Sequence, residues 1–264
     1  MSDLRDAGTF DAALFEARRS ALGARFGAPL TTLRETGSTN DDAFVAAKNG
    51  APHGAVFVAD AQKSGRGRRG STWTSPPGEN LTFSVLLRPS LPAERVSVIA
   101  LVAGLAVRAA AAARVPEPVL IKWPNDVLSC ERKLAGILVE SRLSGADVEA
   151  VVVGVGVNAA MRDLPADIAS IATSLALLGD PSPRREPLLA ELLAGFEERL
   201  GRFERAGLQA LLVELNEHDG LRGKSLKVGD VKGEGCGIGA EGALLLRDAA
   251  GVVHRVTSGT VERL

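Results

Sequence analysis

The chain has 264 residues, a hydrophobic content of 45% and a formal net charge of -1 at pH 7. A chain of this length can bury a sizeable core, as one large domain or as one domain with a small appendage. The charge balance excludes a global field that would draw the protein onto nucleic acid or an anionic membrane. Any basic site must therefore be local.

The N-terminal segment and the cysteines are typical of a cytoplasmic protein. Residues 1–19 carry acids where a secretory signal needs a basic start and an apolar core. Cys130 and Cys236 lie far apart in the sequence with no CxxC pattern, which fits neither a disulfide framework nor a zinc site. We therefore expect a cytoplasmic protein with no membrane association.

In chain order, the first third of the sequence predicts a mixture of helices and strands. Apolar residues at helical spacing indicate an amphipathic helix over residues 10–26, too little for a helix-turn-helix module. A strand over 30–35 follows, and the segment 38–40 (Ser-Thr-Asn) can cap a helix that runs to about Lys48. A buried strand is expected over 55–59.

The middle of the chain predicts more strands around a long loop. Residues 62–80 are rich in glycine, proline and arginine, and loops of that length are usually functional. After this loop the pattern predicts strands over 81–88, 119–122, 133–141 and 148–157, and helices over 93–114, 187–205 and 208–217.

The last part of the chain has a different pattern. From residue 221 onward, short apolar runs alternate with the turn pairs Gly229-Asp230, Glu241-Gly242 and Ala250-Gly251. Such spacing is typical of a small antiparallel barrel. We predict two domains, a larger one over residues 1–219 and the small barrel over residues 220–264.

The strongest local motif is the hexapeptide 65–70, Gly-Arg-Gly-Arg-Arg-Gly. Its glycines let the backbone approach a ligand closely, and its arginines offer forked donors suited to carboxylate or phosphate. A solvated basic loop and an RNA-binding segment are the alternatives, although RNA-binding segments of this kind are usually repeated. The position of the motif between two apolar strands, with Trp73 shortly after it, favours an anion clamp.

Two better-known phosphate motifs are nearly matched and then fail. The hexapeptide has P-loop spacing, but Ser71 stands where the phosphate-reaching lysine must be. Residues 154–159 follow a strand and fit a dinucleotide fingerprint, but the segment 161–165 ends in Pro165 and cannot open the required helix cleanly. What remains is a glycine-lined strand end followed by Asn158, whose amide can bridge a ligand and an anion.

Residues 122–126, Lys-Trp-Pro-Asn-Asp, form a turn with unusual chemistry. Trp123 could stack a purine, and Asn125 and Asp126 could bond it, hold a metal or orient a lysine. Lys133 follows at the head of an apolar strand in which Gly136 leaves room for a ligand. A plain turn and a solvated surface lysine are the alternative interpretations.

Taken together, these segments resemble the catalytic domain of biotin protein ligases, in the same order along the chain. The matching stretches are residues 36–40, Gln62, 65–70, Trp73, 122–126, 133–140 and 154–158, and the segment 237–246 resembles the C-terminal barrel of that family. The resemblance implies an α+β fold with a mixed β-sheet and flanking helices, like class II synthetases, and a small SH3-like β-barrel.

The resemblance also implies a two-step reaction and its participants. Biotin would be activated by ATP with Mg²⁺ to biotinyl-5′-AMP, and then transferred to a lysine of a biotin carboxyl carrier protein or domain. The implied biotin-binding residues are Ser38, Thr39, Asn40, Gln62, Gly65, Arg66, Arg68, Lys133, Gly136 and Gly154. Those implied for ATP or the adenylate are Arg66, Arg68, Arg69, Trp73, Asn125, Asp126, Lys133 and Asn158.

Within these sets, the resemblance implies particular roles. Arg68, Asp126 and Lys133 would be the catalytic residues, Arg66 would clamp the carboxylate and α-phosphate with Arg68, and Trp73 would cover the adenine. Asn125 and Asp126 would serve the nucleotide and either a metal or the orientation of a lysine, and the identity of the metal ligands is left open. Because residues before the first strand are too few for a helix-turn-helix, we expect no operator binding, while a homodimer is possible. A lipoate or octanoate ligase and a catalytically inactive binding protein are the rival functions.

Overall fold

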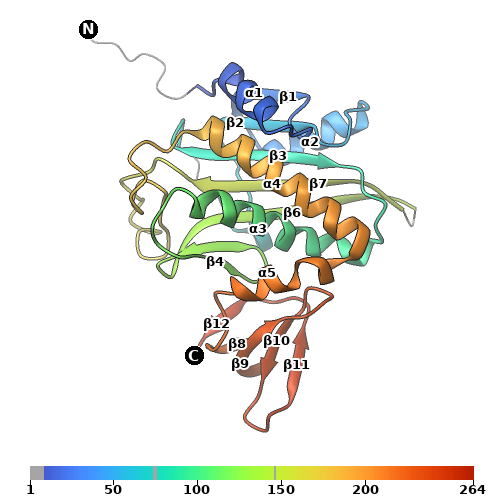
Figure 1. Ribbon diagram of the computed structural model, residues 1–264, viewed down its shortest axis with the longest axis vertical. Helices are drawn as coiled ribbons and strands as arrows, with labels where there is room; N and C mark the ends of the chain where they lie inside the picture. Colours follow the sequence, from blue (N-terminus) through green and yellow to red (C-terminus); the bar gives the residue numbers. More distant parts are fainter. Residues whose placement is uncertain (1–8, 74–75, 146) are drawn as a thin grey trace.

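The computed structural model describes residues 9–73, 76–145 and 147–264 (Figure 1). In these ranges a seven-stranded sheet has the order β1-β2-β3-β7-β6-β5-β4. Only β1 and β2 pair in parallel, and the other neighbours are antiparallel, so the predicted mixed sheet is confirmed. Its strands are β1 (Leu30–Thr36), β2 (Val56–Gln62), β3 (Asn80–Leu87), β4 (Val119–Lys122), β5 (Asp126–Ser129), β6 (Arg132–Ser144) and β7 (Asp147–Asn158).

Helices cover both faces of this sheet. On one face, α3 (Ile99–Ala112) and α4 (Arg185–Ala206) pack against each other, and α1 (Ala12–Ala21) packs on α4 (Figure 1). The opposite face is covered by α2 (Thr39–Lys48), which contacts β2, β3 and β7. The short α5 (Leu212–Glu217) follows α4 at the lower edge of the sheet in Figure 1.

Alternation along the strands divides the core between the two faces. On β2, Val56 and Val58 belong to the large core under α3 and α4, whereas Phe57 packs with α2. On β6, Ile137 belongs to the large core. Because successive side chains of a strand point to opposite faces, Gly136, with residues 138 and 140, lies on the α2 face.

The chain ends in a second sheet that lies below α5 in Figure 1. Its strands are all antiparallel in the order β11-β10-β9-β8-β12. They are β8 (Ser225–Val228), β9 (Val231–Ile238), β10 (Leu244–Arg247), β11 (Val253–Val256) and β12 (Val261–Arg263). The predicted small all-β unit is therefore present, and the domain boundary at residues 219 and 220 remains a proposal.

Three of the predicted helices differ in extent or type from the observed ones. The helix expected over 208–217 is a 3-10 helix, η3 (Leu208–Leu211), followed by α5. The helix expected over 93–114 begins as a 3-10 helix, η2 (Ala93–Val98), and becomes α-helical only at Ile99. The β-branched residues Val96 and Val98 are weak helix formers, and this favours the tighter opening. The helix expected over 10–26 is the shorter α1, which Asp11 caps by accepting the Ala13 and Leu14 amides.

The segment Ala93–Ala112 is long and apolar enough to cross a membrane, judged by length and composition alone. Its most apolar window is 72% buried inside the fold. Ile99, Val102 and Leu105 are all fully buried in the core. The segment is therefore accounted for as a core helix that packs on the central sheet.

Candidate active site

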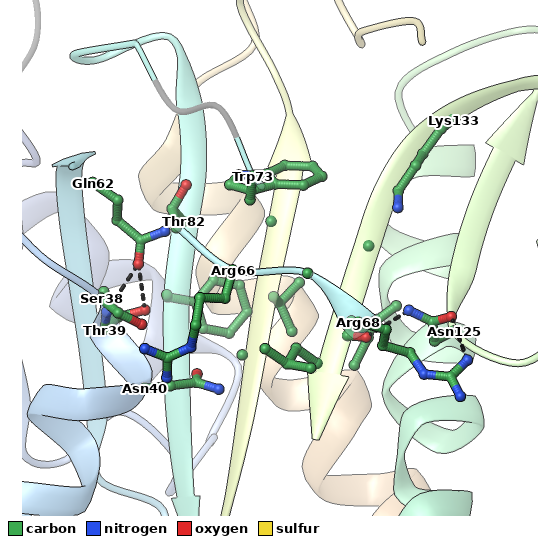
Figure 2. A pocket seen from close by; sticks show the side chains of 18 residues that line it. Ser38, Thr39, Asn40, Gln62, Arg66, Arg68, Trp73, Thr82, Asn125 and Lys133 are labelled. Carbon is green, nitrogen blue, oxygen red and sulfur yellow. Dashed lines mark hydrogen bonds between the residues drawn. The ribbon is translucent and has the colours of Figure 1, made fainter. Parts of the chain in front are cut away.

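A cavity of about 50 Å³ lies on the α2 face of the central sheet, under the loop that follows β2 (Figure 2). It is bounded by the start of α2, by β3, β6 and β7, and by the loop residues 66–73. The structure brings most of the predicted site residues together here: Ser38, Thr39, Asn40, Gln62, Arg66, Arg68, Trp73, Asn125, Lys133, Gly136 and Gly154 all line it.

The floor of the cavity is a hydrogen-bonded polar network. The Thr39 backbone N–H and hydroxyl donate to Gln62 Oε1 at 2.9 and 3.1 Å, as Figure 2 shows. The Ser84 hydroxyl lies 2.7 Å from Thr39 Oγ1 and 2.6 Å from Asn40 Oδ1. Thr39, Asn40 and Ser84 are buried, and the mutual bonds of this network hold the polar edge of the floor in one arrangement.

Two glycines of β7 make room for larger side chains above the sheet. A Cβ atom on Gly154 would stand 2.3 Å from Asn40 Oδ1, and one on Gly156 would stand 2.3 Å from Trp73 Cε2. Neither position can hold a side chain unless its neighbour moves. Gly154 therefore acts through Asn40, and Gly156 is the shelf on which the Trp73 ring lies.

Trp73 lies across this shelf, between the polar floor and Lys133 (Figure 2). Lys133 Nζ is 5.9 Å from the centre of the indole ring, within range of a cation–π contact. The buried indole N–H has no hydrogen-bond partner among the described residues. A buried donor of this kind, inside a cavity, is available to a ligand.

The clamp residue Arg66 is paired with two acidic side chains. Its guanidinium donates to Asp41 at 2.7 and 2.8 Å and to Glu140 Oε2 at 3.2 Å. These hydrogen bonds raise the pKa of Arg66 and lower the pKa of Asp41. The forked donors are therefore held by protein carboxylates, groups with the same chemistry as the carboxylate or phosphate expected from a substrate.

Arg68 reaches the other end of the cavity. Its Nη1 donates to Asn125 Oδ1 at 3.2 Å, and Asn125 Nδ2 donates to the Ile137 carbonyl at 2.8 Å (Figure 2). Burial lowers the pKa of Arg68, as does the neighbouring Arg69 charge, while Asp126 raises it. The guanidinium is still charged, and its partial desolvation strengthens its attraction for an anion.

Lys133 and Asp126 form an ion pair next to the cavity, with Nζ 2.8 Å from Oδ1. The Lys133 backbone bonds the segment after β7, since its N–H donates to Ile171 O at 2.8 Å and its carbonyl accepts from Thr173 at 2.9 Å. The side chain is 37% exposed, so the ammonium group remains accessible. A lysine held in this way is fixed at its backbone and aimed by a carboxylate.

The structure places four predicted residues elsewhere. Gly65, Arg69, Asp126 and Asn158 do not line the first cavity. Asn158 is buried, and its amide donates to the carbonyls of Thr173 at 2.9 Å and Lys133 at 3.4 Å. Its side chain therefore supports the backbone around the site rather than facing the cavity.

The expectation that Trp123 could stack a purine is wrong. The residue is only 1% exposed, and its indole N–H donates to the Gly242 carbonyl at 2.8 Å. Gly242 belongs to the turn between β9 and β10, so this bond joins the central sheet to the second sheet. Trp123 is a structural contact between the two parts of the fold, which the sequence motif alone did not reveal.

Comparison with known proteins gives a consistent result. Residues 34–158 match the model of the biotin/lipoate A/B protein ligase family. A biotin–acetyl-CoA-carboxylase ligase of Mycobacterium tuberculosis is 34% identical over 258 residues, which cover 94% of each chain. The bifunctional ligase/repressor of Bacillus spizizenii is 32% identical, over 85% of this chain and 71% of its own.

Among solved structures, a biotin protein ligase from Aquifex aeolicus in complex with biotin and ATP is similar. The TM-score is 0.77 with 28% sequence identity, over 89% of this chain and 99% of that one. The chain belongs to the biotin protein ligase family. The fold class and the enzyme class expected from the sequence are thereby confirmed.

The binding residues predicted from the sequence did not include several residues of this cavity. Thr82, Phe83, Val155 and Gly156 line the cavity, and Ser84 lies directly beneath it. The available signal was the alternation of polar residues at positions 80, 82 and 84 in an otherwise apolar strand. Because alternate residues share a face, such a pattern in a buried strand marks a polar surface inside the protein.

A second, larger cavity of about 830 Å³ lies beyond the segment 65–70 of the ligase, which we call the arginine loop. Arg66, Arg68 and Asn125 line both cavities, so the loop is the wall between them. The far side of the second cavity is formed by η2, by the end of α4 and by the β9–β10 turn. It therefore spans the junction of the two sheets.

Proposed function

We propose that the first cavity binds biotin and that the arginine loop brings the α-phosphate of ATP to the biotin carboxylate. A carboxylate oxygen would attack the α-phosphorus, and the bond to pyrophosphate would break. The amine of a carrier lysine would then attack the carbonyl of biotinyl-5′-AMP and release AMP. The observation that carries this proposal is the convergence of Gln62, Arg66, Arg68 and Lys133 on one cavity.

The floor suits the polar handles of biotin. The ureido group carries two N–H donors and one carbonyl, and it needs partners of both kinds in an otherwise apolar pocket. Thr39, Asn40 and Gln62 offer amide and hydroxyl groups fixed by the network around Ser84. We assign biotin recognition to these residues with Ser38, and assign to Gly136 and Gly154 the room that recognition needs.

The arginine loop suits the reacting anions. Arg66 and Arg68 would exchange their present partners for the biotin carboxylate and the α-phosphate, with which guanidinium groups form forked hydrogen bonds. Trp73 would leave its glycine shelf and cover the adenine, next to Asn125. The first cavity is far smaller than the roughly 300–1,000 Å³ of typical ligand pockets, so loop movement is part of substrate binding.

Lys133 and Asp126 are proposed to act in the chemical step. The ammonium group would stabilise the negative charge that grows on the phosphoryl oxygens, and Asp126 would hold it in place. Within the described residues, no group of three or more His, Cys, Asp or Glu side chains gathers as a metal cage. Mg²⁺ commonly binds through substrate phosphates, water and one or two carboxylates, and Asp126, the carboxylate paired with Lys133, would be the protein's contribution.

ATP–pyrophosphate exchange with biotin and with lipoate, measured side by side, tests the proposed function. We expect exchange that depends on biotin and is absent with lipoate. Exchange with lipoate alone would favour the rival ligase activity of the same fold. A folded protein that supports neither reaction would favour a binding protein without catalysis.

We further propose that the acceptor is a biotin carboxyl carrier protein or domain, and that the enzyme acts in the cytoplasm without membrane or DNA binding. The sequence has a net charge of -1, which provides little long-range attraction for phosphate backbones. A salt titration with duplex DNA tests this part, and sequence-selective binding at physiological salt would refute it. A homodimer is compatible with the fold.

A further inference from the structure

We infer that Glu140 is a positioning residue that sets the geometry of both the biotin floor and the arginine clamp. The inference rests on the proposed function of the cavity. Glu140 is on β6 and is not among the residues that line the first cavity. Its effect would therefore be exerted through its two neighbours, Asn40 and Arg66.

The geometry that carries the inference is a single shared oxygen. Glu140 Oε2 accepts a hydrogen bond from Asn40 Nδ2 at 2.6 Å and another from Arg66 Nη2 at 3.2 Å. Asn40 belongs to α2 and Arg66 to the loop after β2. Figure 2 shows the two side chains next to each other at the same end of the cavity. Glu140 therefore joins a fixed element to a loop that has to move.

The first consequence is the orientation of the Asn40 amide. Its Oδ1 lies 2.6 Å from the Ser84 hydroxyl, and its Nδ2 faces the carboxylate of Glu140. An ionised carboxylate only accepts hydrogen bonds, so it selects the NH₂ end of the amide. Without Glu140, Asn40 could turn over and present the wrong polar atom to the ureido group.

The second consequence is the position of Arg66. Asp41 occupies two of its donors, and Glu140 holds a third contact. A guanidinium has five N–H donors, so it can release Asp41 to a substrate anion and keep Glu140. Glu140 would then hold the clamp beside the floor while the ligand enters.

A purely structural role would be weak at this place. The Glu140 and Arg66 side chains are 33% and 40% exposed, and ion pairs so accessible to water contribute little to the free energy of unfolding. The ion pair with Arg66 should therefore add little to Tm, and Glu140→Gln, which keeps an acceptor for the buried Asn40 amide, should leave Tm nearly unchanged. A change in biotin binding without a change in Tm distinguishes positioning from stabilisation.

The test compares Glu140→Ala and Glu140→Gln in the full chain. For Glu140→Ala we expect the biotin dissociation constant and the KM for biotin to rise about tenfold or more. This is the size of effect expected when charge-assisted hydrogen bonds are lost. The KM for ATP should rise less, because Arg68 also holds the α-phosphate and the Asn40 side of the floor is assigned to biotin alone. Any fall in Tm should be smaller for Glu140→Gln, which keeps an acceptor for the buried Asn40 amide. Glu140→Gln keeps a neutral acceptor for Asn40, so it should recover part of the lost affinity.

Two further variants serve as controls. Asp41→Asn loosens Arg66 without touching Asn40, so its effect on biotin affinity should be smaller than that of Glu140→Ala. Glu262→Ala removes an exposed carboxylate 3.7 Å from Lys227 in the second sheet, and should not change biotin affinity.

Two outcomes would overturn the inference for a folded, active enzyme: a Glu140→Ala protein with unchanged biotin affinity, or equal increases in the constants for biotin and ATP. A wild-type protein that neither binds biotin nor catalyses biotin-dependent exchange would instead refute the proposed function, and the inference with it. Calorimetry with biotin alone and exchange assays on the same preparations separate these cases.

Discussion

At the scale of single residues, the site combines buried polar groups with charges that water can reach. Thr39, Asn40 and Ser84 are buried and satisfy one another, whereas Lys133 is 37% exposed and paired with Asp126. Buried polar groups hold one geometry because a broken hydrogen bond there is costly. The charged groups can exchange partners, and that is what binding an anionic substrate requires.

We predict that Lys133→Ala slows ATP–pyrophosphate exchange by about a hundredfold or more. An ammonium aimed at the α-phosphate helps most when negative charge is greatest, and losing one preorganised donor costs roughly 2.7 to 4 kcal/mol. Biotin affinity should fall less than the exchange rate. Lys224→Ala, which removes a lysine paired with Glu131 away from the cavity, is the control. An unchanged rate would reject the catalytic role of Lys133.

At the scale of elements, side-chain hydrogen bonds attach the arginine loop both to α2 and to the second sheet. Arg66 binds Asp41 on α2, and Arg69 Nη1 donates to Thr260 Oγ1 at 2.6 Å, next to β12. Arg69 also has a positive φ of 56°, a backbone conformation that residues other than glycine rarely adopt. The bond to Thr260 therefore links a strained loop to the second sheet.

We predict that Thr260→Val loosens this loop. Valine has nearly the shape of threonine but cannot accept the bond from Arg69, so amide hydrogen exchange over residues 65–73 should become faster. Tm should change little, because the lost contact is exposed. Thr257→Val is the matched control, since Thr257 lines the second cavity without a bond to Arg69. Equal exchange in both variants would exclude the proposed link.

At the scale of the whole molecule, the two sheets meet at a few buried contacts. Trp123 donates to Gly242, and the link around Asp219 bonds the edge of the central sheet, where Ile121 donates to the His218 carbonyl at 2.8 Å and accepts from Gly220 N–H at 2.7 Å. Asp219 is 8% exposed, its Oδ1 accepts from Leu221 N, and its Oδ2 has no hydrogen-bond partner among the described residues. Burial raises the pKa of Asp219 above its ordinary value.

We predict that Asp219→Asn raises Tm at neutral pH. A raised pKa in the folded state means that the ionised carboxylate destabilises the fold, fully so above the folded pKa. The penalty disappears as pH falls through that value towards the unfolded pKa of about 3.9. The difference in Tm between variant and wild type should therefore shrink as pH is lowered from 7 to about 4. A difference that grows on acidification would contradict the assignment.

The sequence by itself determined the family, the order of most elements and the chemistry of the loop. These depend on local properties: periodicity predicts strands, glycines with arginines predict an anion site, and residues 122–126 with Lys133 resemble one ligase family. The same local reasoning misjudged Trp123, because whether an aromatic ring lies in the core or in a pocket depends on what packs against it.

Only the tertiary structure decided which side chains touch. Glu140 and Asn40 are far apart in the sequence, yet Glu140 Oε2 and Asn40 Nδ2 are 2.6 Å apart. The reason is that residue 140 of β6 lies on the face of the sheet that α2 covers. Position 154 likewise requires glycine because the Asn40 side chain occupies the space where a Cβ would be. Contacts between distant segments follow from strand order and register, and no single segment of the sequence contains that information.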